Sequence, residues 1–125
     1  MKDRIEWLKE NRLLVQRVLE HVQNVTQIGL KVTERKNSLV ISFPSERIQM
    51  YSTGPNRMEV KTGGELLFTQ DPDDGMKVRH RMPHMSNVGE IVKPEIIETM
   101  APSNVTEQKI YEQVIFFLER MRTMS

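Results

Sequence analysis

The chain has 125 residues, with 18 Lys and Arg side chains against 17 Asp and Glu, and it contains no cysteine. The length suits one domain, so we expect residues 1–125 to fold as a single domain. The absence of cysteine excludes disulfides, cysteine nucleophiles, iron–sulfur clusters and thiolate-bound zinc. The near balance of charge argues against a surface that is basic all round, but it is compatible with a local charged patch.

The first predicted element is an amphipathic helix over residues 3–25, expected to end near Gly29. Its apolar side chains recur at spacings of three, four and seven residues. They are Ile5, Leu8, Val15, Val18, Leu19, Val22 and Val25. Trp7, Leu14 and His21 add a row with heptad spacing along one flank. This row is either a wider contact with the core or a second apolar seam for self-association, and we favour a homodimer through the seam.

From residue 28 the apolar residues alternate with polar ones, which is typical of half-buried strands. Residues 28–82 hold five to six such runs, separated by short turns such as "RKNS" at 35–38 and "TGGE" at 62–65. Adjacent glycines suit a tight hairpin turn. Successive short strands joined by compact turns predict an antiparallel meander. The acidic stretch at 71–75 fits a turn, because its spacing does not match a calcium-binding loop.

Residues 83–104 contain three prolines and are expected to be irregular, with at most one helical turn from Pro94 to Met100 or a short strand. Residues 105–122 form a second amphipathic helix, with Asn104 as the N-cap and Glu107 completing a capping box. The predicted fold class is therefore α+β: an antiparallel meander of five to six strands flanked by an N-terminal and a C-terminal helix. Either both helices cover one face of the sheet, or one of them packs across a dimer interface.

The stretch "MKVRHRMPHM" at 76–85 offers ligands for a soft metal ion such as Cu(I). The weak candidate ligands are His80, Met82, His84 and Met85. In a strand, however, Met76, Val78, His80 and Met82 share one face, and the basic residues share the other. We therefore expect His80 to be a core histidine with one hydrogen-bond partner, and we expect no metal and no cofactor.

The outward positions of the predicted sheet carry a group of basic residues that could bind nucleic acid or another anionic partner. The proposed binding residues are Arg47, Tyr51, Arg57, Lys61, Lys77, Arg79 and Arg81. Lys31 belongs to the same face, against Glu59 and Glu65, and Val40 and Leu67 interrupt it. The alternative is a solvated sheet face, because lysine and arginine on exposed strands also prevent aggregation.

No catalytic motif for a serine or metal hydrolase, a P-loop or a dinucleotide site is present. The leading hypothesis is a non-catalytic binding or adaptor module that acts through protein–protein contacts and self-associates. The alternative is a nucleic-acid-binding protein that uses the basic sheet face, and an enzyme with a motif-free site comes third. The charged amino-terminal residues and the lack of a long apolar run predict a cytoplasmic protein without a membrane partner.

Overall fold

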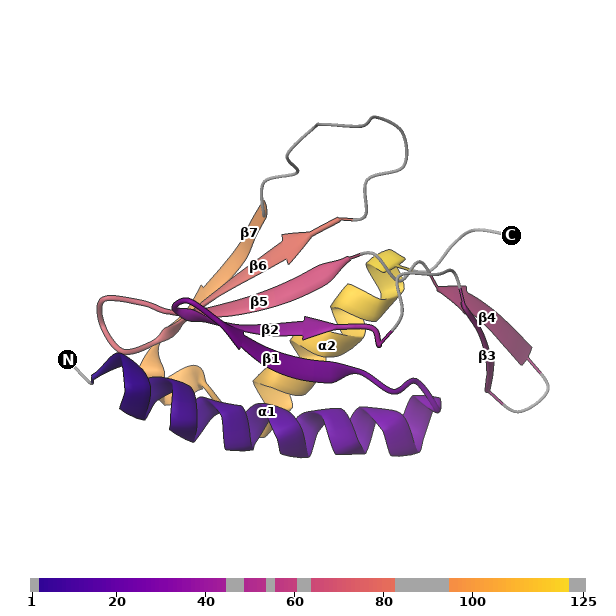
Figure 1. Cartoon of the computed structure of the whole chain (residues 1–125), viewed down its shortest axis with the longest axis horizontal. Helices are drawn as coiled ribbons and strands as arrows, with labels where there is room; N and C mark the ends of the chain where they lie inside the picture. Colours follow the sequence, from indigo (N-terminus) through magenta and orange to yellow (C-terminus); the bar gives the residue numbers. More distant parts are fainter. Residues whose placement is uncertain (1–2, 45–48, 54–55, 61–63, 83–94, 122–125) are drawn as a thin grey trace.

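A computed structural model of the chain describes residues 3–44, 49–53, 56–60, 64–82 and 95–121. It confirms the α+β class, because an N-terminal and a C-terminal helix flank a five-stranded antiparallel sheet (Figure 1). Of residues 49–53 and 56–60, the structure describes the backbone pairing alone.

Helix α1 (Arg4–Thr26) buries one stripe of side chains: Trp7, Leu8, Val15, Val18, Leu19 and Val22. It ends before Gly29, because Gln27 adopts a left-handed φ of 64° and its N–H bonds to the Gln23 carbonyl at 2.9 Å. Helix α2 (Glu107–Met121) begins two residues later than the sequence predicted. Thr106, rather than Asn104, caps it, since the Thr106 hydroxyl oxygen accepts the Lys109 N–H at 3.2 Å. Asn104 instead ends a 3₁₀ turn, η1 (Pro102–Asn104).

The main sheet has the strand order β1 (Lys31–Arg35), β2 (Ser38–Ser42), β5 (Glu65–Gln70), β6 (Met76–Arg81), β7 (Glu95–Met100). The strands β3 (Gln49–Thr53) and β4 (Asn56–Val60) form a separate two-stranded sheet. The expected continuous meander is therefore interrupted: the chain leaves the sheet after β2 and returns in β5, which pairs directly with β2. The sequence left a helical turn and a short strand open for this segment, and residues 95–100 form the strand.

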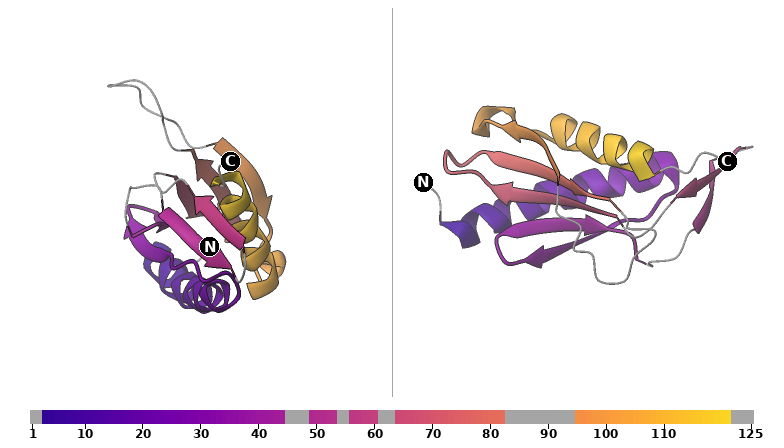
Figure 2. Two further views of the ribbon diagram at one scale, coloured as in Figure 1. Left: turned by 90° about the vertical axis from the view of Figure 1, so that its right-hand side faces the viewer. Right: turned by 90° about the horizontal axis from the view of Figure 1, so that it is seen from above.

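Both helices lie on the same face of the five-stranded sheet (Figure 1, Figure 2). In Figure 1, α2 lies behind the sheet and α1 runs along its lower side, so the face toward the viewer carries no helix. The inward side chains of the sheet join both helices in one core, in which the rings of Phe43 and Phe117 lie 6.1 Å apart. We call the helix-covered side the inner face and the opposite side the outer face.

The turn between β5 and β6 brings the chain close to the end of β7. The Asp74 N–H bonds to the Asp71 carbonyl at 2.9 Å, and Asp74 has a φ of 64°. A Cβ atom at Gly75 would overlap the Met100 carbonyl oxygen. The acidic stretch thus forms the expected turn, and the missing side chain at Gly75 lets this turn pack against the backbone of β7.

Candidate anion-binding face of the sheet

Strand β6 divides its side chains between the two faces as the alternation predicted. Met76, Val78 and His80 are buried on the inner face. The alternate residues, Lys77, Arg79 and Arg81, are half-buried on the outer face. Side chains two residues apart in a strand share a face and lie about 7 Å apart. The three basic residues therefore form a straight line along β6.

Cross-strand pairing places further basic residues on the outer face. At one end of the sheet, Lys31, Ser42, Glu65 and Arg81 are register neighbours across four strands. At the other end, the neighbours are Arg35, Ser38, Thr69 and Lys77. Between these two rows, Thr33, Val40, Leu67 and Arg79 cross the middle of the face. The outer face thus carries five basic side chains against one carboxylate among the described residues.

That carboxylate, Glu65, binds two arginines from different strands. Arg35 forms a bidentate ion pair with it, with distances of 3.1 and 2.7 Å from the two terminal guanidinium nitrogens to the two carboxylate oxygens. Arg81 donates to the same carboxylate at 2.8 Å. Because β2 lies between β1 and β5, the pair between Arg35 and Glu65 crosses β2 on the outer face. Bidentate geometry fixes the orientation of the guanidinium group as well as its position.

Two apolar residues at the centre of the outer face are buried. Val40, on β2, is 0% exposed and Leu67, on β5, is 8% exposed, although neither belongs to the core under the helices. Val40 lies on the strand that the ion pair between Arg35 and Glu65 crosses. The centre of this face is therefore apolar but closed.

The surroundings of Glu65 change its protonation equilibrium. Partial burial alone would raise the pKa of this carboxyl group, but the hydrogen bonds and positive charges of Arg35 and Arg81 outweigh burial and lower the pKa. Glu65 is therefore ionised at neutral pH, and it neutralises only one of its two arginine partners. One positive charge remains at this end of the face.

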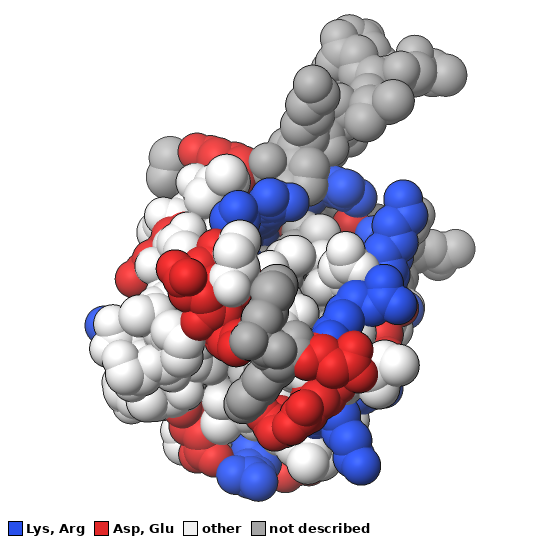
Figure 3. Space-filling model, turned by 90° about the vertical axis from the view of Figure 1, so that its left-hand side faces the viewer, with Lys and Arg blue, Asp and Glu red and all other residues white. Residues whose placement is uncertain are grey.

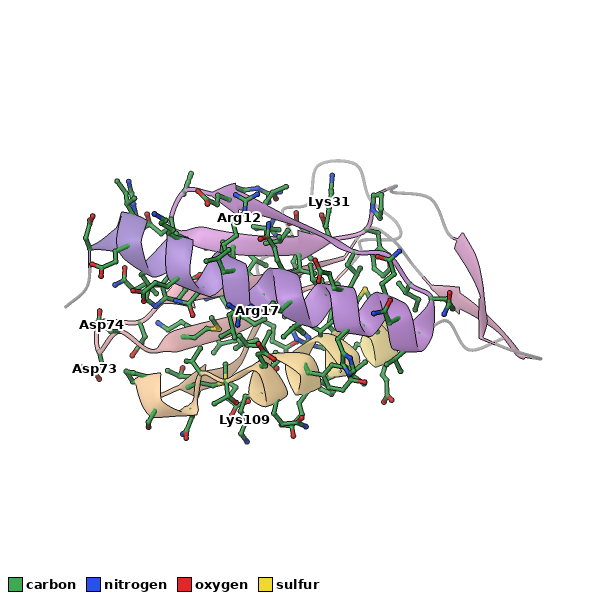
Figure 4. The ribbon with its side chains drawn as sticks, turned by 90° about the horizontal axis from the view of Figure 1, so that it is seen from below. Arg12, Arg17, Lys31, Asp73, Asp74 and Lys109 are labelled. Atoms are coloured by element: carbon green, nitrogen blue, oxygen red, sulfur yellow. The ribbon has the colours of Figure 1, made fainter. Side chains whose placement is uncertain are left out.

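Three other cations on the outer face form no ion pair with a described residue. Within the described part of the chain, no carboxylate forms an ion pair with Lys31, Lys77 or Arg79. In Figure 4, Lys31 points away from both helices, whereas Lys109 on α2 points away from the sheet on the opposite side. The right-hand edge of Figure 3, which is the side of the molecule that faces the viewer in Figure 1, carries lysine and arginine side chains with acidic side chains beside them. No described carboxylate competes with an external anion for Lys31, Lys77 or Arg79.

The remaining residues predicted for this face are not part of it or are not described. Tyr51 and Arg57 belong to the separate β3–β4 hairpin. Arg47 and Lys61 lie outside the described residues. The sequence interpretation also missed Arg35, because this residue was assigned to the turn at 35–38, whereas it is the last residue of β1. The period-two pattern of Val32 and Glu34 could have extended the strand to Arg35.

His80 lies under α2 on the inner face and is fully buried. Its Nδ1 lies 3.0 Å from a guanidinium nitrogen of Arg120, and Arg120 also pairs with Glu95 at 3.0 Å. Arginine can only donate, so Nδ1 accepts and the ring is neutral. Burial, and after it the charge of Arg120, lowers the pKa of His80 to about 4, although Glu95 opposes the shift. The Nε2 atom is buried and has no hydrogen-bond partner among the described residues.

This environment does not support the copper hypothesis. Met82 packs against the core, and His84 and Met85 lie outside the described residues. Among the residues that the structure describes, no three His, Asp or Glu side chains gather around a point where a metal ion could bind. A guanidinium group, itself a cation, occupies the Nδ1 side of His80. His80 thus has the single hydrogen-bond partner expected of a core histidine.

The heptad row on α1 contacts the same chain. Trp7 is 1% exposed, Leu14 packs against the core, and the ring of His21 lies 5.0 Å from the ring of Tyr111 on α2. Beside His21, which is exposed, an open pocket of about 280 Å³ lies between the two helices, and Arg17, labelled in Figure 4, pairs with Glu107 at 3.2 Å. The described contacts of the row are within the chain and favour the wider core contact of the two alternatives. Self-association through these residues stays a prediction.

No described helix combines the length and the apolar character needed to cross a bilayer, and the cytoplasmic location stays a prediction. Comparison of the chain with protein-family models, with curated proteins and with solved structures finds no match.

Proposed function

We propose that this chain is a non-catalytic binding protein that holds an anionic partner on the outer face of the five-stranded sheet. One observation carries the proposal: among the described residues, five basic side chains and one carboxylate lie on the face opposite the two helices, in a chain whose formal net charge is only +1. The described part of this face thus has an excess of basic over acidic residues that the chain as a whole does not have. Such a local excess attracts anions even when the whole protein is nearly neutral.

The arrangement of the charges adds to the proposal. Glu65 holds the guanidinium groups of Arg35 and Arg81 in fixed positions, so less side-chain entropy is lost when an anion binds there. Lys31, Lys77 and Arg79 form no ion pair with a described residue and can neutralise negative charge directly. The face therefore combines two oriented arginines with three free cations.

Binding of heparin, a generic sulfated polyanion, tests the proposal. The double variant Lys77→Glu/Arg79→Glu should lose at least tenfold in affinity at low salt. The control Lys9→Glu/Lys109→Glu makes the same change in net charge on exposed positions of the two helices, and it should change the affinity less than twofold. Equal losses in both variants, or no heparin binding at low salt, would refute a binding site on the outer face.

Self-association is a second candidate, favoured by the edge of the sheet at β7. Among the described strands, β7 pairs only with β6, and its Ile96 is 58% exposed. Phe116 of α2, which stacks on His80 of β6, is 46% exposed. An exposed apolar edge strand can pair with a second copy of the chain.

Light scattering over a concentration series tests this candidate. A dimer that Ile96→Lys converts to a monomer, while Ile5→Lys at the exposed start of α1 does not, would support pairing through β7. A monomer at every concentration of the unmodified chain would exclude it.

A further inference from the structure

We infer that the anionic partner is the phosphate backbone of a double-stranded nucleic acid, bound without reading of the base sequence. The inference rests on the proposed function, because it names the partner of the same face. The supporting observations are the spacing of the unpaired cations, the chemistry of the surface between them and the lack of an outward aromatic ring among the described residues of the sheet.

The unpaired basic residues lie in two rows on opposite sides of the outer face. Lys31 lies on β1, and Lys77 and Arg79 lie on β6, whereas the guanidinium groups of Arg35 and Arg81 meet at Glu65 between the rows. Strands β2 and β5 separate these rows, so the backbones of β1 and β6 are three strand spacings, or roughly 14 Å, apart. The major groove of a double helix is about 12 Å wide, with a phosphate backbone on each side. Long, flexible side chains can bridge the remaining difference, so one row can contact each backbone.

The surface between the rows is better suited to lie over the groove of a double helix than to bind a stacked base or a peptide side chain. Its outward residues on β2 and β5 are Ser38, Val40, Ser42, Glu65, Leu67 and Thr69. The two apolar members are closed to solvent, and the hydroxyls of Ser38 and Thr69 bond to each other at 2.8 Å. A flat sheet surface with short side chains reaches the phosphates at the rim of a groove but not the base edges at its floor.

The same surface argues against two other partners. Single-stranded nucleic acid is usually held by aromatic side chains on which the bases stack, and the described outward residues of the five-stranded sheet include no aromatic ring. An acidic protein segment would need a pocket for an apolar anchor. Val40 and Leu67 offer none because they are buried, and Ile96, the register neighbour of Arg79, is 58% exposed and does not line a pocket with them. A ligand recognised by charge and spacing alone fits best.

Fluorescence anisotropy with a labelled 20-base-pair DNA duplex tests the inference. We expect the duplex to bind at least tenfold more tightly than either of its single strands, and a duplex of shuffled sequence to bind within twofold of the first. If all five cations neutralise phosphates, log K should fall with log salt with a slope of roughly −4 to −5. Lys77→Glu/Arg79→Glu should make that slope shallower by about 2, and Lys9→Glu/Lys109→Glu should leave it unchanged.

Competition experiments separate this inference from the proposed function. If poly-glutamate, or vesicles with anionic headgroups, bind the unmodified chain more tightly than the duplex and lose affinity in Lys77→Glu/Arg79→Glu, the anion-binding face stands but the partner is wrong. Tighter binding of the single strand than of the duplex also overturns the inference. Failure of heparin and of every other anion to bind overturns both proposals.

Thermal unfolding confirms that each variant is folded before its affinity is compared. Arg79→Gln, which removes one charge without adding another, replaces the double variant if that variant does not fold. It should weaken duplex binding and make the salt slope shallower by about 1, and an unchanged slope would count against the inference.

Discussion

On the inner face of the five-stranded sheet, Leu66 and Phe68 are fully buried under the two helices, whereas Leu67 between them is 8% exposed on a face that no described helix covers. The inner face is closed by apolar packing, which is insensitive to salt. On the outer face, an ion pair between Arg35 and Glu65 crosses β2, and salt screens such a solvent-exposed pair. The same strands therefore provide stability on one side and an electrostatically adjustable surface on the other.

Truncation on the inner face should have the largest effect. Phe68→Ala removes a fully buried ring from the core, so we expect the free energy of unfolding to fall by about 3–5 kcal/mol. Leu67→Ala on the outer face should cost only about 2 kcal/mol, since water can reach the space that it leaves. Urea denaturation measures both. Equal losses would show that the outer face is packed as a second core.

Acid should destabilise the inner face first. The pKa of His80 is about 4 in the folded chain, against an ordinary value of 6.5, so between these pH values the unfolded chain binds a proton that the folded chain does not. Stability should therefore fall as the pH drops from 6.5 to 4, by up to about 3 kcal/mol. His80→Leu should remove this part of the pH dependence. Denaturation curves at several pH values measure it, and an identical slope in His80→Leu would contradict the assignment.

Loss of the Glu65 carboxylate should lower stability less than truncation of the inner face does, and it should strengthen duplex binding. Glu65→Gln leaves Arg35 and Arg81 without a charged partner, so we expect a loss of about 1–2 kcal/mol. It also removes the negative charge that Glu65 places among the described outer-face residues, so duplex affinity should rise. Because the pKa of Glu65 is lowered, its stabilisation is lost only as the pH falls below the ordinary carboxyl range. Weaker duplex binding by Glu65→Gln would mean that orienting the arginines matters more than charge.

Charge reversal at the unpaired outer cations should change stability least. Lys77 and Arg79 form no ion pair with a described residue, so Lys77→Glu/Arg79→Glu should alter the free energy of unfolding by less than about 0.5 kcal/mol. The same variant should greatly weaken anion binding. A large loss of stability, seen in thermal unfolding, would show that these cations maintain the fold instead of binding a partner.

The periodicity of the sequence predicted the helices and most strands, because side-chain burial follows spacing along one element. It could not predict which strands pair. The runs at 49–53 and 56–60 alternate like the others, yet the structure pairs them with each other, and β2 pairs with β5 across the gap. Pairing depends on contacts between distant segments, which spacing does not encode. At 95–100, the preceding Pro94 suited a helix start as well as a strand, and pairing with β6 selects the strand.

The candidate site was partly predictable for the same reason. Once β6 was taken as a strand, Lys77, Arg79 and Arg81 had to share one face. The bond from Arg35 across β2 to Glu65 depends on side chains 30 residues apart in sequence, and no local pattern indicates it. Sequence could therefore indicate the sign of the charge on this face, but not the meeting of Arg35 and Arg81 at Glu65.

The burial of Val40 on the outer face also affects how the sheet opens locally. In β2 and β5, three successive residues are buried on alternating faces: Leu39, Val40 and Ile41 in one strand and Leu66, Leu67 and Phe68 in the other. Water cannot reach the backbone bonds between them from either side of the sheet. The amide hydrogens of this pair should therefore exchange with deuterium most slowly and only through global unfolding, while those of β7 at the edge exchange through local fraying.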